Sequence, residues 1–213
     1  MRAWTHALRL PAEREVFVSR FNRVLAVLIW AAAAALIVGL LVSVHDVRLL
    51  YVVPCALFAF IGWALLWRPR LTVADEGIEV INVTRTVDIP WQALIHVDTK
   101  YALTLYTPGH KFPVWSAPAP GTARTLRATR RETTGRVGKP NVADSVRRPG
   151  DLLSTESGAA AEVVRRRWLE LQQSGAVDSG LADETPVTVR WHIVSLAVLA
   201  ALAVGTLAAL LVA

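Results

Sequence analysis

The side chains that could carry acid–base, nucleophilic or metal chemistry are scattered along this sequence. The five histidines are His6, His45, His96, His110 and His192. None has ligand spacing with a carboxylate or with the single cysteine, Cys55. His96 and Asp98 share one face of a predicted strand, but such a pair is usually solvated sheet surface. The chain also lacks the motifs G-x-S-x-G and H-E-x-x-H and a phosphate-binding glycine loop. We therefore expect a protein that is not an enzyme, without catalytic residues, a metal site or a cofactor.

Arginine is the residue type that could bind a ligand here, and the net charge is +6. Each cation near an anionic membrane surface contributes about 1 kcal/mol to attraction. The candidate contacts for anionic lipid are Arg68, Arg70, Arg85, Arg124, Arg127, Arg130 and Arg131. The alternative is that these arginines only orient the chain and keep it soluble. Nucleic acid is not an expected partner, because the arginines from Arg124 to Arg148 lack the interleaved aromatic residues of a stacking platform and belong to no recognised nucleic-acid-binding module.

Three long apolar runs surround and position these charges: Val24–Val44, Leu49–Trp67 and Ile193–Ala213. About 20 apolar residues in a helix span the hydrocarbon core of a bilayer. The pattern predicts a two-helix transmembrane hairpin at 24–67 and a third transmembrane helix at 191–213. Hydrophobic residues make up 54% of the chain, which fits three spans.

The distribution of arginine predicts the orientation of these spans. The segment 1–23 carries Arg2, Arg9, Arg14, Arg20 and Arg23, whereas the loop after the first run carries only Arg48. Because positive flanks stay in the cytoplasm, we expect a multi-pass protein of the plasma membrane. Its basic N-terminal segment 1–23 and its middle domain would be cytoplasmic, and its C-terminus extracytoplasmic.

The middle of the chain predicts a small β domain at 68–175. Short alternating runs predict about six to seven antiparallel strands that close into a small barrel, with the first hairpin turning at Asp75-Glu76-Gly77. A helix at 158–173 has an apolar stripe that includes Val164, Trp168 and Leu171. An arginine-rich insert at about 117–150 has few large apolar residues and is expected to be disordered. Residues 176–190 form a polar tether to the third span.

One motif carries a resemblance to a known family. It reads R-P-R-L-T-V-x-x-x-G-I-x-V-x-N-x-x-R-T-x-x-I-P-W and covers Arg68 to Trp91. With a helix hairpin before it and an amphipathic helix after it, the chain resembles the bacterial pleckstrin-homology (PH) domain membrane proteins of actinobacteria. The resemblance implies a PH barrel closed by its C-terminal helix. It also implies a domain that binds protein partners or forms oligomers. Phosphoinositide binding is not expected, because the hairpin that is basic in lipid-binding PH domains is acidic here.

These observations predict a membrane-anchored interaction or scaffold module on the cytoplasmic face. Its PH-like domain would bind a protein partner or self-associate, with membrane lipids as a further contact. An alternative is an accessory subunit of a larger envelope or respiratory membrane complex. In that case the small-residue helix faces, such as Ala31–Ala35 and the stretch around Gly205, would form the contact.

Overall fold

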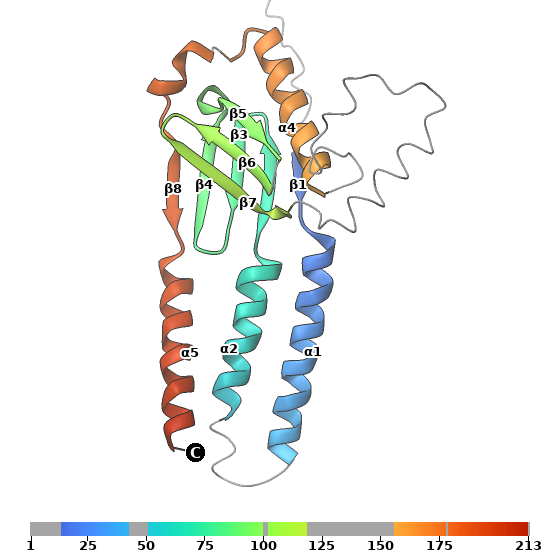
Figure 1. Ribbon diagram of the computed structural model, residues 1–213, viewed down its shortest axis with the longest axis vertical. Coiled ribbons are helices and arrows are strands. Elements are labelled where there is room, and N and C mark those ends of the chain that lie inside the picture. The colour runs from blue at the N-terminus through green and yellow to red at the C-terminus, as the bar shows by residue number, and fades with distance from the viewer. Residues whose placement is uncertain (1–13, 43–50, 100–101, 119–155, 178, 213) are drawn as a thin grey trace, which may run out of the picture.

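Three helices lie side by side below two small β-sheets and a covering helix (Figure 1). The structure is a computed structural model, and it describes residues 14–42, 51–99, 102–118, 156–177 and 179–212. The arginine-rich insert expected at 117–150 lies almost wholly outside the described residues.

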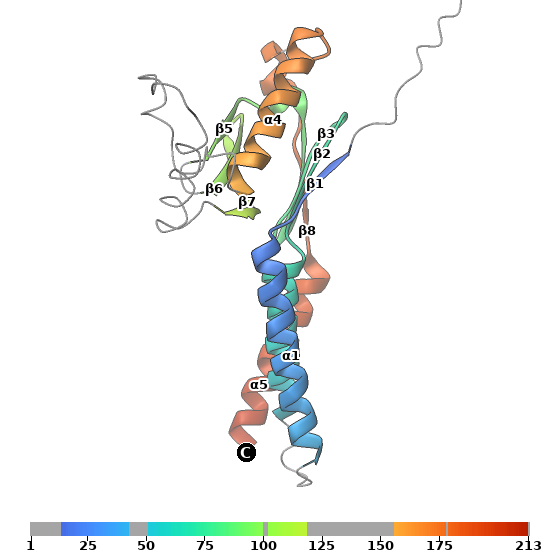
Figure 2. The same ribbon diagram turned by 90° about the vertical axis from the view of Figure 1, so that its right-hand side faces the viewer.

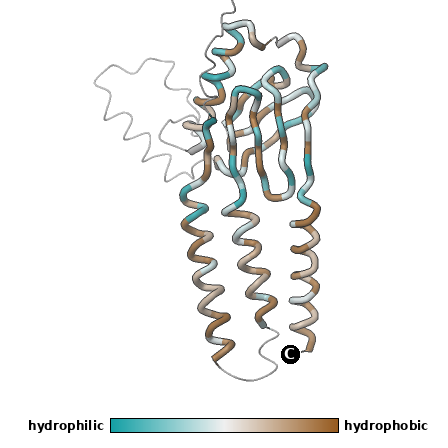
Figure 3. The backbone as a smooth tube through the Cα atoms, turned by 180° about the vertical axis from the view of Figure 1, so that it is seen from behind, coloured by the Kyte–Doolittle hydropathy of each residue, from teal (hydrophilic) through white to brown (hydrophobic). Residues whose placement is uncertain are grey.

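The three helices differ in length. They are α1 (Arg20–Val42), α2 (Val52–Gly62), which continues as the π-helical turn η2 (Trp63–Trp67), and α5 (Ile193–Val212). Among the described residues, α1 and α5 are long and apolar enough to cross a membrane, whereas Val52–Trp67 is a shorter apolar helix. Figure 3 shows apolar residues along all three helices. Pro54 lies in the first turn of α2, where a missing N–H group has no cost.

Close contacts at glycines bring the helices together, with α2 between the other two (Figure 1). A Cβ atom at Gly62 would lie 2.9 Å from Cγ2 of Ile29 on α1, and one at Gly205 would lie 3.1 Å from Cγ1 of Val53 on α2. The Trp30 indole Nε1 donates a hydrogen bond to the Ala59 carbonyl at 3.0 Å. Small residues therefore set the helix spacing, as is common where helices pack closely.

The larger sheet, sheet A, has five antiparallel strands in the order β1-β2-β3-β4-β8. They are β1 (Glu15–Phe17), β2 (Arg70–Ala74), β3 (Gly77–Ile81), β4 (Arg85–Pro90) and β8 (Thr188–Trp191). The two edge strands come from segments for which the sequence predicts no strand, the N-terminal flank and the tether. Both are short, so their alternation is visible only once β2 and β4 are there to pair with them.

The smaller sheet, sheet B, has the order β5-β6-β7 and follows the 3₁₀ turn η3 (Trp91–Ala93). Its strands are β5 (His96–Asp98), β6 (Ala102–Thr107) and β7 (His110–Pro118). The sequence predicts a small barrel, and the structure corrects this prediction. The described strands form a sandwich of two separately hydrogen-bonded sheets. The Asn82 side chain bridges the sheets, donating to the Pro113 carbonyl at 2.8 Å and accepting from the Trp115 N–H at 3.1 Å. Pro113 has no N–H group to offer a neighbouring strand, which disfavours a continuous ladder here.

The core lies between the sheets and beneath α4 (Glu156–Gln173). Sheet A contributes Leu71, Val73, Ile78, Val80, Val87 and Ile89, and sheet B contributes Val97, Leu103, Leu105, Phe112 and Val114. The predicted stripe of the helix is confirmed: Val164 is fully buried, and Trp168 and Leu171 pack against the core. Trp91 is 2% exposed, and its Nε1 donates to the Ala74 carbonyl at 2.9 Å. After α4, the 3₁₀ helix η6 (Ser179–Glu184) leads into β8.

Candidate functional site

The junction between sheet A and the helices is the most distinctive feature of the molecule, and we call it the neck. It comprises residues 18–23, 67–70, 82–86 and 190–195. β1 leads into α1, η2 leads into β2, and β8 leads into α5, all at the same end of the strands (Figure 1). The turn between β3 and β4 lies at this end too, where the His192 N–H donates to the Thr84 carbonyl at 2.9 Å. Each connection is only one or two residues long, so the sheet is held in a fixed position on the helices.

The neck contains six arginines and no aspartate or glutamate. They are Arg20, Arg23, Arg68, Arg70, Arg85 and Arg190. The hydropathy colouring changes at this level, from apolar helices to a mixed sheet (Figure 3). Such a positive collar at the ends of apolar helices is what an anionic headgroup layer would attract.

Aromatic rings hold several of these guanidinium groups in place. Arg23 lies over the Trp67 ring, with its Cζ 4.9 Å from the ring centroid, and Arg68 lies over Trp63 at 5.1 Å. Arg85 lies near two rings, Phe112 at 5.5 Å and Trp191 at 5.6 Å. Cation–π contacts of this kind contribute about 0.5–1 kcal/mol at exposed sites. Tryptophan beside arginine is also the usual composition of a membrane–water interface.

Arg68 connects the end of the helix hairpin to α5. Its Nη1 donates to the Ser195 hydroxyl at 2.6 Å, although the two residues are far apart in sequence. Burial lowers the pKa of Arg68, and the nearby charge of Arg70 lowers it further. A partly buried cation beside a second cation gains from an anion nearby, so a phosphate group would be favoured at this position.

His192 connects the sheet to α5. Its Nδ1 lies 3.3 Å from the Val83 carbonyl and its Nε2 lies 2.8 Å from the Thr86 hydroxyl. A carbonyl can only accept, so Nδ1 carries the proton, and in the neutral ring Nε2 accepts from Thr86. Burial lowers the pKa of His192, the hydrogen bond to Val83 opposes this, and the charges of Arg68 and Arg190 lower it again. The neutral ring is therefore the favoured form.

The first hairpin of sheet A, where lipid-binding PH domains are basic, points away from the neck (Figure 1). Its turn residues are Asp75 and Glu76. Asp75 forms an ion pair with Arg167 of α4, and the hydrogen bond that Arg167 donates to Asp75 raises the pKa of Arg167. The turn is thus acidic, far from the helix ends and joined to α4, which argues against binding of an inositol phosphate at this turn.

The structure brings together three of the arginines that the sequence singles out. Arg68, Arg70 and Arg85 all lie in the neck, whereas Arg124, Arg127, Arg130 and Arg131 lie outside the described residues. Sequence reasoning missed His192 and Arg190 as part of this group. The signal available was their place immediately before the third apolar run, next to Trp191.

The described histidines and carboxylates do not assemble into a reactive centre. Within the described part of the chain, no three His, Cys, Asp or Glu side chains lie close enough to hold a metal ion. His96 lies beside Tyr106 on the surface of sheet B, with the ring centroids 5.8 Å apart and the ring planes tilted by 51°.

Comparison with known proteins gives one result that fits this fold. Searches of curated proteins and of solved structures find no match. Residues 68–152 match the family model described as "Bacterial PH domain". The match includes all the strands from β2 to β7, and the two antiparallel sheets with a C-terminal helix are the PH-like arrangement. PH domains are generally non-catalytic modules that bind proteins or lipids. The match and the fold together identify a PH-like domain in this part of the chain.

Proposed function

We propose that this chain is a membrane-anchored interaction module whose PH-like domain binds a protein partner or a second copy of itself. The observation that carries the proposal is the neck, where three short connections join sheet A to apolar helices at one end of its strands. A domain held this way keeps a fixed height and orientation at the membrane surface. Its faces away from the neck are then presented to partners, as a scaffold requires.

Anionic lipid contributes through the neck in this proposal. The neck carries six arginines and no aspartate or glutamate of its own, and one of the six, Arg190, forms ion pairs with Asp88 and Glu79 of sheet A. Three of these arginines lie beside the indole rings of Trp63, Trp67 and Trp191. Tryptophan side chains are common in the headgroup region of a bilayer. The lipid contact is therefore general attraction to anionic headgroups near the helix ends, rather than recognition of one headgroup by the first hairpin.

Lipid retention by the purified full chain tests this contribution. We expect native mass spectrometry from mild detergent to show more bound phosphatidylglycerol than phosphatidylcholine. Arg70 is exposed, so Arg70→Gln should lower phosphatidylglycerol retention up to roughly fivefold without disturbing the fold. Arg166→Gln on α4, away from the neck, is the matched control. Equal retention of both lipids would contradict the lipid contribution.

A second candidate function is an accessory subunit of a larger envelope or respiratory membrane complex. The observation that favours it is the exposure of the outer helices. Only 11% of the most apolar stretch of α1 is buried, and only 6% of that of α5. In the run Ala31–Ala35, Ala33 alone is buried, so the other small residues face outward. Partner helices could pack closely against such a surface.

Purification from the native membrane in mild detergent, followed by mass spectrometry, separates the two functions. Stoichiometric recovery with the subunits of one defined complex supports the accessory-subunit function. Recovery of the chain as homo-oligomers, or with a single soluble partner that requires the PH-like domain, supports the interaction module. The chain recovered only as a monomer under all conditions would contradict both.

A further inference from the structure

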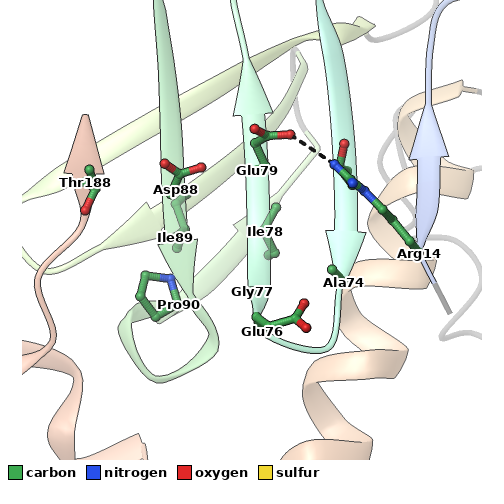
Figure 4. A pocket seen from close by; sticks show the side chains of 11 residues that line it. Arg14, Ala74, Glu76, Gly77, Ile78, Glu79, Asp88, Ile89, Pro90 and Thr188 are labelled. Carbon is green, nitrogen blue, oxygen red and sulfur yellow. Dashed lines mark ion pairs between the residues drawn. The ribbon is translucent and has the colours of Figure 1, made fainter. Parts of the chain in front are cut away.

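The outer face of sheet A points away from sheet B and α4 (Figure 2). This face carries a hollow, which Figure 4 shows from close by. We call it the outer hollow, and its volume is about 490 Å³. Strand register creates its floor: Ala74 lies opposite Gly77, and Gly77 lies opposite Pro90. Three neighbouring strands thus present almost no side chain at this level, which leaves a flat, open surface.

Acidic side chains border this floor. Register places Glu79 opposite Asp88 on the outer face, and Glu76 lies at the hairpin turn (Figure 4). Two carboxylates directly opposite each other on neighbouring strands repel. Arg190 offsets part of this repulsion, because its Nη2 lies 2.8 Å from Oδ2 of Asp88 and 3.8 Å from Oε1 of Glu79. Glu76 has no ion pair with any residue that the structure describes.

Two buried polar atoms at the outer hollow lack hydrogen-bond partners in the described structure. Thr72 is 2% exposed, and its hydroxyl makes no hydrogen bond. Oε2 of Glu79 is also buried without one, because the nearest cation, Nη2 of Arg14, is 3.6 Å away. Leaving such a group unsatisfied is unfavourable. A ligand with N–H donors would satisfy the Glu79 oxygen and remove that cost.

The chemistry of the missing donor is that of a guanidinium group. The lining holds three carboxylates against one cation, Arg14, whose side chain is 62% exposed and only loosely paired. A guanidinium is flat, fits a floor without side chains, and donates to two carboxylates at once. A metal ion is disfavoured, because the described residues form no group of metal-ligating side chains.

We propose that the outer hollow binds an arginine side chain of a protein partner. The arginine lies on the Gly77 and Pro90 floor, takes the place of Arg14, and donates to Glu76 and to the unsatisfied Oε2 of Glu79. The outer hollow lies at the end of the sheet away from the neck, so a partner reaches it from the aqueous side (Figure 1). This inference rests on the proposed role of the domain as an interaction module, and it names the partner chemistry that the module recognises.

Nuclear magnetic resonance of the full chain in phosphatidylcholine nanodiscs tests the inference. The probe is N-acetyl-arginine amide, and its neutral isostere N-acetyl-citrulline amide is the control. The methyl groups of Ala74 and Thr72 report on the outer hollow. We expect saturable shifts with the arginine probe and binding at least about tenfold weaker with citrulline, since the charged hydrogen bonds are lost.

Two variants make the test specific. Glu76→Gln removes one carboxylate from an exposed turn and should weaken binding of the arginine probe severalfold. Glu162→Gln, at an exposed position of α4, should leave binding unchanged. Equal shifts with both probes, or binding unaffected by Glu76→Gln, would overturn the inference. If a partner still co-purifies with the Glu76→Gln and Glu79→Gln variants, the inference fails while the interaction function stands.

Discussion

At the scale of single residues, His192 is the group whose ionisation is most closely tied to the position of the sheet on the helices. Its ring contacts Val83 in the turn between β3 and β4 and Thr86 in β4, while its carbonyl, just before α5, accepts from the Leu196 N–H at 3.0 Å. The lowered pKa means that the unfolded chain takes up a proton near pH 6.5, whereas the folded chain stays neutral to lower pH. Unfolding therefore becomes easier as the pH falls below about 6.5.

The first prediction concerns this dependence. His192→Gln keeps hydrogen-bonding capacity but cannot ionise, so its stability should decline less between about pH 7.5 and pH 5. Thermal unfolding in detergent at several pH values measures the slope. His96→Gln, on the surface of sheet B, serves as the control. An identical pH slope for His192→Gln and the unmodified chain would contradict the assignment.

A second prediction at this scale concerns Gly77. A Cβ atom there would lie 2.6 Å from the Ile89 carbonyl oxygen, and backbone cannot move aside easily. Gly77→Ala should cost about 1–3 kcal/mol, as overpacking usually does. Gly109→Ala is the comparison, because Gly109 has φ +71° but open space around it. Denaturant unfolding of both variants should show the larger loss for Gly77→Ala, and the reverse order would contradict the close approach.

The same scale shows what the sequence could predict. Arg68 and Arg70 could be placed at the neck because they follow an apolar run directly. The surroundings of Arg85 could not be predicted, since its two ring contacts, Phe112 and Trp191, come from distant parts of the chain. Spatial contacts of this kind leave no local pattern.

At the scale of elements, the side chain of Asn82 forms hydrogen bonds between the two sheets where no strand pairing joins them. It is 5% exposed and bonds two backbone groups of β7. Asn82→Ala should leave those groups unsatisfied and destabilise the domain by about 1–3 kcal/mol. Chemical denaturation compared with Gln173→Ala, an exposed control on α4, measures it. A loss no larger than that of the control would contradict the bridging role.

The elements also mark where prediction from sequence ends. The strands β2 to β7 and the stripe of α4 follow from alternation and helical spacing. The strands β1 and β8 are only three and four residues long and pair with strands far away in sequence. Whether such a short segment becomes a strand depends on the edge it meets, and that edge exists only in the folded sheet.

At the scale of the whole molecule, the proposed orientation places the N-terminus and the PH-like domain in the cytoplasm. It follows from the arginine distribution. Cysteines introduced at Asp183 and at His45, in a Cys55→Ser background, test it with a membrane-impermeant maleimide. Position 45 should react in intact cells and position 183 only after permeabilisation. The opposite pattern would contradict the orientation, without affecting the fold of the domain.

The central claim is that the neck holds sheet A at the surface of a bilayer, with its strands directed away from the membrane. Spin labels at Thr84→Cys, Glu76→Cys and Val198→Cys, in the Cys55→Ser background, report on the neck, the far end of β3 and the second turn of α5. Five residues of strand rise about 17 Å, so positions 84 and 76 should differ in depth by about that much when β3 runs along the membrane normal. Depth measurement by power-saturation electron paramagnetic resonance in vesicles should place label 198 in the hydrocarbon, label 84 at the headgroups and label 76 in water. Labels 84 and 76 at equal depth, or label 198 in water, would contradict the account.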